Sequence, residues 1–134
     1  MDMPTPEKLR RLPLFEGLTE PELDALAGRV SEFEAPAGSV LIEIGQPGSG
    51  LFVIEAGTVE VELPGGQAVT VGPGEFVGEL ALLTDDPHRA RVRATSSVRC
   101  LAIARRDFAS LLSDHPGVAV AMLPVLARRL AGMI

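Results

Sequence analysis

The strongest constraint on the fold is a central segment in which glycines separate short apolar runs. Between residues 30 and 103, glycine stands at positions 38, 45, 48, 50, 57, 65, 66, 72, 74 and 78. The runs between and after these glycines are rich in valine, isoleucine and leucine, and they cover residues 40–44, 51–54, 58–63, 67–71, 90–94 and 98–103. Two of them, 58–63 and 90–94, alternate in polarity, as half-buried strands do.

The connections between the runs decide how such strands can be arranged. Residues 64–66, Pro-Gly-Gly, are a tight hairpin signal between two of the runs. Most runs have no segment of helical length between them, which argues against a parallel doubly wound sheet. About seven or eight strands, with a turn signal roughly every 8–12 residues, predict an antiparallel roll or sandwich.

Helical patterns flank this centre on both sides. Thr19 and Glu22 have the spacing of a capping box, and Gly28 follows the last apolar position of that pattern. Near the other end, residues 106–112 and 118–134 carry apolar side chains at helical spacing. Pro124 should kink the second of these helices or delay its start.

We therefore expect a single domain that is mainly β with flanking helices. Its parts are N-terminal helices in residues 1–29, a β-roll in residues 30–104 and a C-terminal helix pair in residues 105–134.

Composition limits the cellular compartment and the classes of partner that we expect. The net charge of −6 argues against a general nucleic-acid binder. No apolar run approaches the roughly 20 residues that span a bilayer, and the first ten residues do not resemble a secretory signal. Cys100 is the sole cysteine, so no internal disulfide can form, and we expect a cytoplasmic protein without a membrane partner.

Arginine is concentrated late in the chain. All eight arginines of residues 68–134 follow Asp86. Such a segment on an acidic protein suits a small bound anion better than a long polyanion. A solvated arginine face is an equally open interpretation.

The segment from Gly74 to Ala94 carries the chemistry. Gly78 leaves a predicted strand, and Glu79 to Leu83 can form one helical turn. Amide groups at a helix start lack internal partners and attract anions. With the cationic side chains that follow, they could hold one phosphate, while Glu79 accepts a hydrogen bond from a hydroxyl group.

Residues 78–82, Gly-Glu-Leu-Ala-Leu, resemble the phosphate-binding cassette of the cyclic nucleotide-binding domain. This family includes bacterial catabolite activator proteins, regulatory subunits of protein kinase A and cyclic-nucleotide-gated channels. The resemblance extends to Leu12-Pro13-Leu14-Phe15 and to the glycines at 38, 45, 50 and 57, and so covers nearly the whole chain. It implies an antiparallel β-roll of the double-stranded β-helix or jelly-roll type, with the cassette in residues 78–94.

The resemblance also implies roles for individual residues. Backbone amides of Gly78, Leu80 and Ala81 would bind a cyclic phosphate, and Glu79 would bind the ribose 2′-hydroxyl. The family pattern after the loop proline is Arg-x-Ala-x-Val-x-Ala.

Here His88 stands at the arginine position, with Arg89 next and Ala90 after it. Adjacent side chains on a strand point to opposite faces, so Arg89 could replace the arginine only if a local bulge re-aims its side chain. His88, Arg89 and Ala90 are all candidates to line the phosphate site.

A lid over the base is a further implication. In this family the terminal helix covers the base, which would place Met133 and Ile134 against it. Arg91 stands where the family has a small residue near the sugar and base. Its side chain could stack on a purine, although a position facing solvent is favoured.

Two functions remain open. The first is a ligand-sensing module that binds a cyclic nucleotide, most plainly cAMP and otherwise cGMP, and repositions its terminal helix for an unknown effector protein or domain. A homodimer through that helix fits this function. The second is a structural or interaction module that keeps the fold without the nucleotide.

Catalysis finds little support in the sequence. Only His88 and His115 are present, so the histidine set of a metal-binding roll is missing, and we expect no metal site, no cofactor and no enzyme activity. Cys100 lies inside a strand pattern and should be a buried apolar residue. Because no helix-turn-helix follows Ile134, we do not expect this chain by itself to bind DNA.

Overall fold

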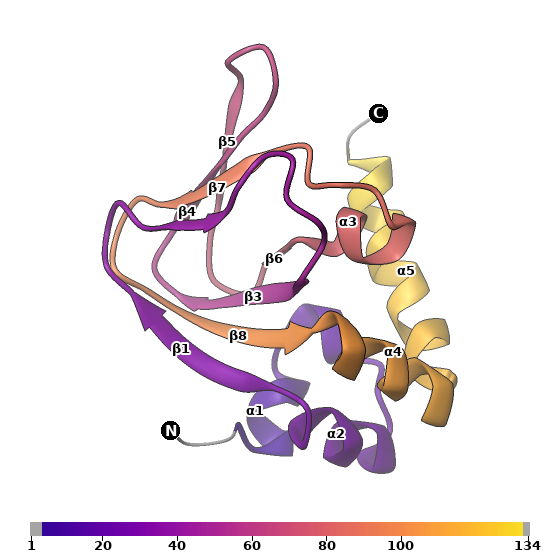
Figure 1. The fold of residues 1–134 in the computed structure, drawn as a ribbon. Coiled ribbons are helices and arrows are strands. Elements are labelled where there is room, and N and C mark those ends of the chain that lie inside the picture. The colour runs from indigo at the N-terminus through magenta and orange to yellow at the C-terminus, as the bar shows by residue number, and fades with distance from the viewer. Residues whose placement is uncertain (1–3, 133–134) are drawn as a thin grey trace.

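The computed structural model describes residues 4–132, and their strands form two four-stranded antiparallel sheets (Figure 1). The first sheet has the order β1-β8-β3-β6, made by Ser31–Ala35, Val98–Ala104, Gly50–Ala56 and Phe76–Val77. The second has the order β2-β7-β4-β5, made by Val40–Ile42, Arg91–Ala94, Val59–Glu62 and Ala68–Val71. The two sheets close into the predicted β-roll, so the predicted fold class is confirmed.

Strand bounds differ from the sequence prediction in a few places. The predicted run 40–44 ends as a strand at Ile42, because Glu43 and Ile44 enter a turn. The hairpin at 64–66 joins β4 to β5 as expected, with Val61 opposite Val69. Strand β1 was not predicted, and β6 was predicted only as the strand that Gly78 leaves, without bounds. Both are strands through their pairing, β1 with β8 and β6 with β3.

The N-terminal helices cover the first sheet. They are α1 (Pro6–Arg10), the short 3-10 helix η1 (Pro13–Phe15) and α2 (Glu20–Ala27). The capping box is present: the Thr19 amide donates to Glu22 Oε1 at 2.8 Å, and the Glu22 amide donates to Thr19 Oγ1 at 3.4 Å. Helix α2 ends at Gly28, as predicted.

Three further helices follow, α3 (Glu79–Thr84), α4 (Arg105–Asp114) and α5 (Gly117–Ala131). Pro124 lies inside α5, which begins at Gly117, so the alternative of a late start is wrong. The chain bends by 116° between α4 and α5. Among the described residues no single helix is long and apolar enough to cross a membrane, and only α4 and α5 taken together reach that length and hydropathy.

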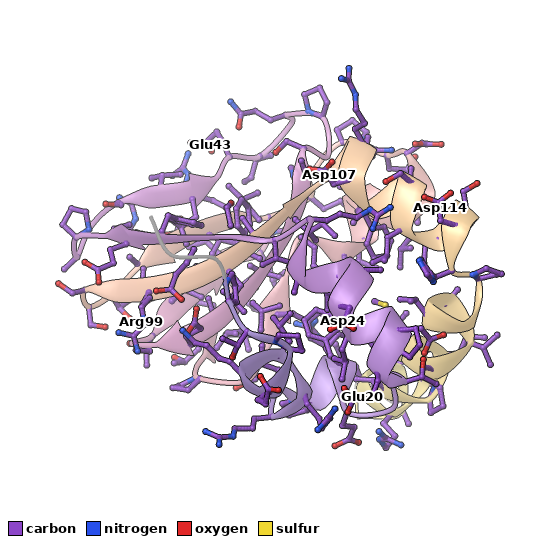
Figure 2. The ribbon with its side chains drawn as sticks, turned by 90° about the horizontal axis from the view of Figure 1, so that it is seen from below. Glu20, Asp24, Glu43, Arg99, Asp107 and Asp114 are labelled. Atoms are coloured by element: carbon purple, nitrogen blue, oxygen red, sulfur yellow. The ribbon has the colours of Figure 1, made fainter. Side chains whose placement is uncertain are left out.

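Acidic side chains follow the outer surface of the helical layer. In Figure 2, Glu20 and Asp24 lie along α2, and Asp107 and Asp114 lie near the two ends of α4. Arg29 ties these two helices together, since its Nη2 donates to Asp114 Oδ2 at 2.9 Å.

The apolar core has two parts. One cluster packs the helices against the first sheet, and its buried residues include Leu9, Leu23, Phe76, Phe108 and Met122. The other fills the space between the two sheets with residues that include Ile42, Val77, Val92, Ala94 and Cys100. Strand β6 contributes to both, because its two side chains point to opposite faces of the sheet. It leads directly into α3.

Candidate ligand site

The junction between β6 and α3 can be built only around glycine. Gly78 caps α3 with φ of 91°, a left-handed conformation that side chains rarely adopt. A Cβ atom at this position would lie 2.7 Å from the Gly50 carbonyl oxygen and 3.4 Å from Ile42 Cδ1. Gly78 therefore lets α3 begin in close contact with both sheets.

A second glycine brings the β2–β3 loop against α3. A Cβ atom on Gly48 would lie 2.7 Å from the carbonyl carbon and oxygen of Ala81. Only a residue without a side chain permits this approach, so the loop and the first turn of α3 form one surface.

Arg105, the first residue of α4, forms hydrogen bonds that join α4 to this surface. Its Nε donates to the Gly48 carbonyl at 2.6 Å and its Nη2 to the Ala81 carbonyl at 2.6 Å. Its Nη1 binds Asp85 Oδ1 at 2.5 Å, at the end of α3. These contacts hold the loop, α3 and the start of α4 in one arrangement.

Glu79 lies in the first turn of α3 and meets α5, which runs alongside (Figure 1). Its side chain is 14% exposed, and Oε1 is 3.0 Å from Arg129 Nη1. The Arg129 guanidinium also stacks on Phe76, 4.2 Å from the ring centroid. Burial raises the pKa of the Glu79 carboxyl, and the positive charge of Arg129 opposes that rise.

The contact between these two residues is an ion pair without an aligned hydrogen bond. Arg129 Nη1 is buried and has no hydrogen-bond partner among the described residues. A donor in this position has unused hydrogen-bonding capacity beside a carboxylate.

His88 lies in the extended chain that leads into β7 and is 8% exposed. Its amide donates to the Gln46 carbonyl at 2.9 Å, and its carbonyl accepts from the Gly45 amide at 2.9 Å. Burial lowers the pKa of the His88 imidazole, and the charge of Arg105 lowers it further. The ring is therefore neutral near pH 7.

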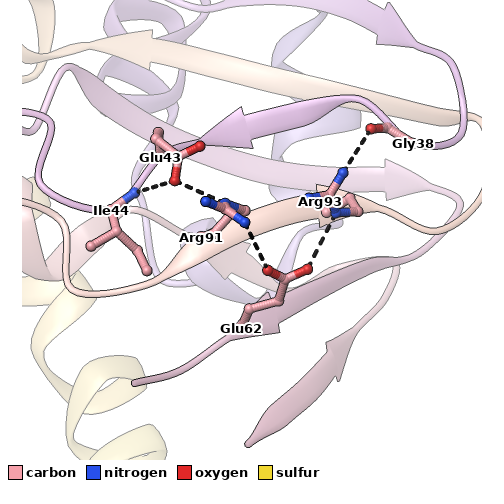
Figure 3. A network of polar contacts seen from close by, with 6 residues as sticks. All are labelled: Gly38, Glu43, Ile44, Glu62, Arg91 and Arg93. Carbon is pink, nitrogen blue, oxygen red and sulfur yellow. Dashed lines mark hydrogen bonds and ion pairs between the residues drawn. The ribbon is translucent and has the colours of Figure 1, made fainter. Parts of the chain in front are cut away.

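The three arginines that follow point the other way. Arg89 is 77% exposed and lies 3.6 Å from Asp86. Arg91 Nε binds Glu43 Oε1 at 2.8 Å, and Arg93 Nε binds Glu62 Oε1 at 3.2 Å, on the outer face of the second sheet (Figure 3).

This network has three further contacts. Arg91 Nη1 lies 3.6 Å from Glu62 Oε2, Arg93 Nη1 donates to the Gly38 carbonyl at 3.4 Å, and the Ile44 amide donates to Glu43 Oε1 at 3.0 Å. The hydrogen bond from Arg91 also lowers the pKa of the Glu43 carboxyl.

The family can now be assigned. A model of the cyclic nucleotide-binding domain matches residues 32–115, which include both sheets from β1 onward and the start of α3 with Glu79. The chain belongs to the cyclic nucleotide-binding domain family.

The relatives of this chain within the family are proteins of different kinds. A cyclic nucleotide-gated potassium channel of Mesorhizobium japonicum is 36% identical over 81% of this chain. A CRP-like cAMP-activated global transcriptional regulator of Mycobacterium tuberculosis is 29% identical over 92% of this chain. The chain spans 30% of the length of the channel and 58% of the length of the regulator.

A solved structure is also similar in fold. The regulatory subunit of a cAMP-independent protein kinase A from Trypanosoma brucei matches with a TM-score of 0.78 and 29% identity, covering 90% of this chain and 42% of that one. These relatives are a channel, a transcriptional regulator and a kinase regulatory subunit.

The structure brings some of the predicted residues together. Gly78, Glu79 and Ala81 meet the Gly48 loop and Arg129, whereas the Leu80 side chain is exposed. His88, in the extended chain before β7, is buried like Val92, and Ala90 is half-buried.

Other predicted residues lie elsewhere. The side chains of Arg89 and Arg91 engage carboxylates outside the roll. Met133 and Ile134 lie outside the described residues.

Two residues of the site were missed by the sequence analysis. Arg129 had a signal, because it falls at helical spacing on the same stripe as Met122 and Leu126, where an arginine needs an ionic partner. Arg105 had none, since its acceptors are backbone carbonyls that no side-chain pattern reveals.

Cys100 is buried, as predicted, and burial raises the pKa of its thiol to about 11. Among residues 4–132 no group of three histidine, cysteine or acidic side chains is placed to hold a metal ion.

Proposed function

We propose that this domain is a ligand-sensing module that binds a cyclic nucleotide, cAMP in the first instance, between the β-roll and α5. The observation that carries the proposal is the pair between Glu79 and Arg129. It joins the position that binds the ribose in this family to the terminal helix, at 3.0 Å and largely out of solvent.

Each residue of the cassette then has a role. The first amides of α3, at Leu80 and Ala81, have no partner within a helix and face the cyclic phosphate together with the amide of Gly78. The Glu79 carboxylate accepts a hydrogen bond from the ribose 2′-hydroxyl. Ala90 leaves room beside the phosphate, and His88 stands where the family has its arginine.

Signalling follows from the shared carboxylate. A ribose hydroxyl on Glu79 changes what Arg129 can contact, so the nucleotide favours one position of α5 over another. A ligand shifts such an equilibrium only by its difference in affinity for the two positions. Met133 and Ile134, two residues beyond the described part of α5, would close over the base.

Helix α5 also carries an apolar surface through which the signal could pass to a partner. Val120, Leu123 and Leu130 are exposed large apolar side chains, and they repeat on one side of the helix. This stripe suits a homodimer through α5 or contact with an effector protein or domain, and it contains nothing that recognises nucleic acid.

The choice of nucleotide rests on the relatives. The regulator from M. tuberculosis is cAMP-activated by name, and its match covers most of this chain, so cAMP is placed before cGMP. The second candidate function is a structural or interaction module without nucleotide. It is favoured by the neutral, buried His88 and by the cAMP-independent kinase subunit among the structural neighbours.

Calorimetric titration with cAMP and with cGMP separates the two functions. Saturation at one site per chain is expected for the sensor. Glu79→Gln should weaken the nucleotide by about 1–3 kcal/mol, since it replaces a charged acceptor by a neutral one. Glu34→Gln, at an exposed position on β1, is the matched control. Absence of binding to either nucleotide at millimolar concentration would favour the structural module.

A further inference from the structure

His88 is a buried polar side chain without a partner. It is 8% exposed, and its imidazole forms no hydrogen bond or ion pair with the described residues. Its backbone is fixed on both sides by the hydrogen bonds to Gly45 and Gln46. The backbone therefore holds the ring in place, and no described residue uses its hydrogen-bonding capacity.

The charges around the site leave the ring uncharged. Arg105 of α4 is a like charge for an imidazolium, and the neighbouring carboxylate of Asp85 is already bound to that guanidinium. Across the start of α3, the Glu79 carboxylate is paired with Arg129.

The remaining carboxylates nearby are also engaged. Glu43 of the β2–β3 loop binds Arg91 on the outer face, and Asp86 lies beside Arg89 in the exposed loop. No acidic partner for His88 is found in residues 4–132.

We propose that the domain binds its anionic ligand together with a proton, and that His88 takes up this proton when the cyclic phosphate enters the roll. This inference rests on the proposed function and adds its regulation. An arginine at this position carries its charge before and after binding. The imidazole gains a counterion only in the complex, so protonation and binding favour each other.

The consequence is an affinity that depends on pH. Between the pKa of His88 in the free domain and its higher pKa in the complex, the affinity falls by up to about tenfold for each unit of rising pH. The cyclic phosphodiester keeps its single charge throughout this range, so the ligand contributes no change of its own. The domain then responds to acidity and nucleotide jointly.

The test is calorimetric titration of the whole chain with cAMP at several pH values between about 5.5 and 8.5. Each titration is run in two buffers of different ionisation enthalpy, so that the heat reports the protons taken up. We expect tighter binding at low pH and uptake of up to about one proton per nucleotide. His88→Gln should bind more weakly with a flat profile, and His88→Arg more tightly with a flat profile.

Glu79 is the other group near the ligand whose pKa is shifted. Glu79→Gln therefore serves as the control: it should weaken binding at every pH but keep the slope that His88 produces. Loss of the slope in this variant would assign the proton to Glu79 and overturn the inference.

The outcomes separate the inference from the function on which it rests. Measurable binding by the unchanged chain with a flat profile and no proton uptake overturns the inference and leaves the sensor intact. Binding by His88→Arg alone also overturns it, because the imidazole then does not substitute for the arginine at any pH. No binding by either protein at any pH overturns the proposed function itself.

Discussion

The two faces of β7 and of the chain leading into it differ in what each side chain meets. Toward the roll, His88 and Val92 are buried. On the other face, Arg91 and Arg93 lie beside carboxylates in contact with solvent (Figure 3). Arg89 lies beside Asp86 in the same way. The segment is rich in cations, yet its inner face carries none. Recognition of an anion depends on which residues of a strand face inward, and the number of arginines in the segment does not reveal it.

Interactions on the two faces also differ in how much free energy they contribute. Ion pairs between partly exposed side chains contribute about 0–1 kcal/mol each. A hydrogen bond to a charged group in a buried site contributes about 1.5–3 kcal/mol. Substitutions near the inner face should therefore change binding and stability strongly, and those on the outer face weakly.

The largest effect is expected where the inner face meets α3. Gly78→Ala places a methyl group 2.7 Å from the Gly50 carbonyl oxygen in a left-handed conformation, and should lower the free energy of unfolding by about 2–4 kcal/mol. Gly65→Ala is the control, because Gly65 has φ of 93° and open space around it, and should cost about 1 kcal/mol. Equal losses in urea unfolding would mean that backbone strain alone accounts for both.

An intermediate effect is expected from the link to α5. Arg129→Gln removes the ion pair with Glu79 and the stacking on Phe76, and should lower the free energy of unfolding by about 1–2 kcal/mol near neutral pH. Arg128→Gln is the neighbouring control, since Arg128 lies 3.5 Å from Glu16 at an exposed site.

The deficit of Arg129→Gln should depend on pH in a defined direction. The pKa of Glu79 is raised in the folded chain, so its protonated form stabilises the fold at low pH, and this stabilisation is lost as pH rises through the folded pKa. Without Arg129 the pKa rises further. Urea unfolding should therefore show a larger deficit near pH 8 than near about pH 4, and a deficit that shrinks with rising pH would contradict this role.

The smallest effect is expected on the outer face. Arg91→Gln removes the contacts with Glu43 and Glu62, and should lower stability only slightly, and less at high salt, because both groups are solvated. Cyclic nucleotide affinity should change less than about twofold, because this side chain points away from the roll. Arg89→Gln provides the comparison for a fully solvated arginine. A tenfold loss of nucleotide affinity in Arg91→Gln would instead indicate that Arg91 contacts the base.

Local signals in the sequence predicted much of the fold. The capping box at Thr19 and Glu22, the hairpin at 64–66 and most strands depend on neighbours in the chain. Strand β1 escaped prediction because Phe33 is its one large apolar residue and its pairing partner, β8, lies more than sixty residues later. Strand β6 was predicted before Gly78, but its two-residue length depends on its pairing with β3.

The candidate site was predicted in part for the same reason. The cassette is a continuous stretch with a recognisable pattern, so Gly78 and Glu79 could be named from it. The direction of the arginines depended on strand register, and the contact of Arg129 with Glu79 joins residues fifty positions apart. Such a contact is formed by packing between distant elements, which a local pattern does not encode.

The fastening of α4 by Arg105 has a mechanical consequence. Since Arg105 fixes the start of α4 to the loop and to α3, α5 is an arm attached at the 116° elbow that follows α4. Its 15 residues make an arm of about 22 Å, so a rotation of about 10° at the elbow carries its far end about 4 Å. Arg129 lies near that far end, so a small change in its contact with Glu79 acts at the greatest distance from the bend and can produce the largest rotation of α5.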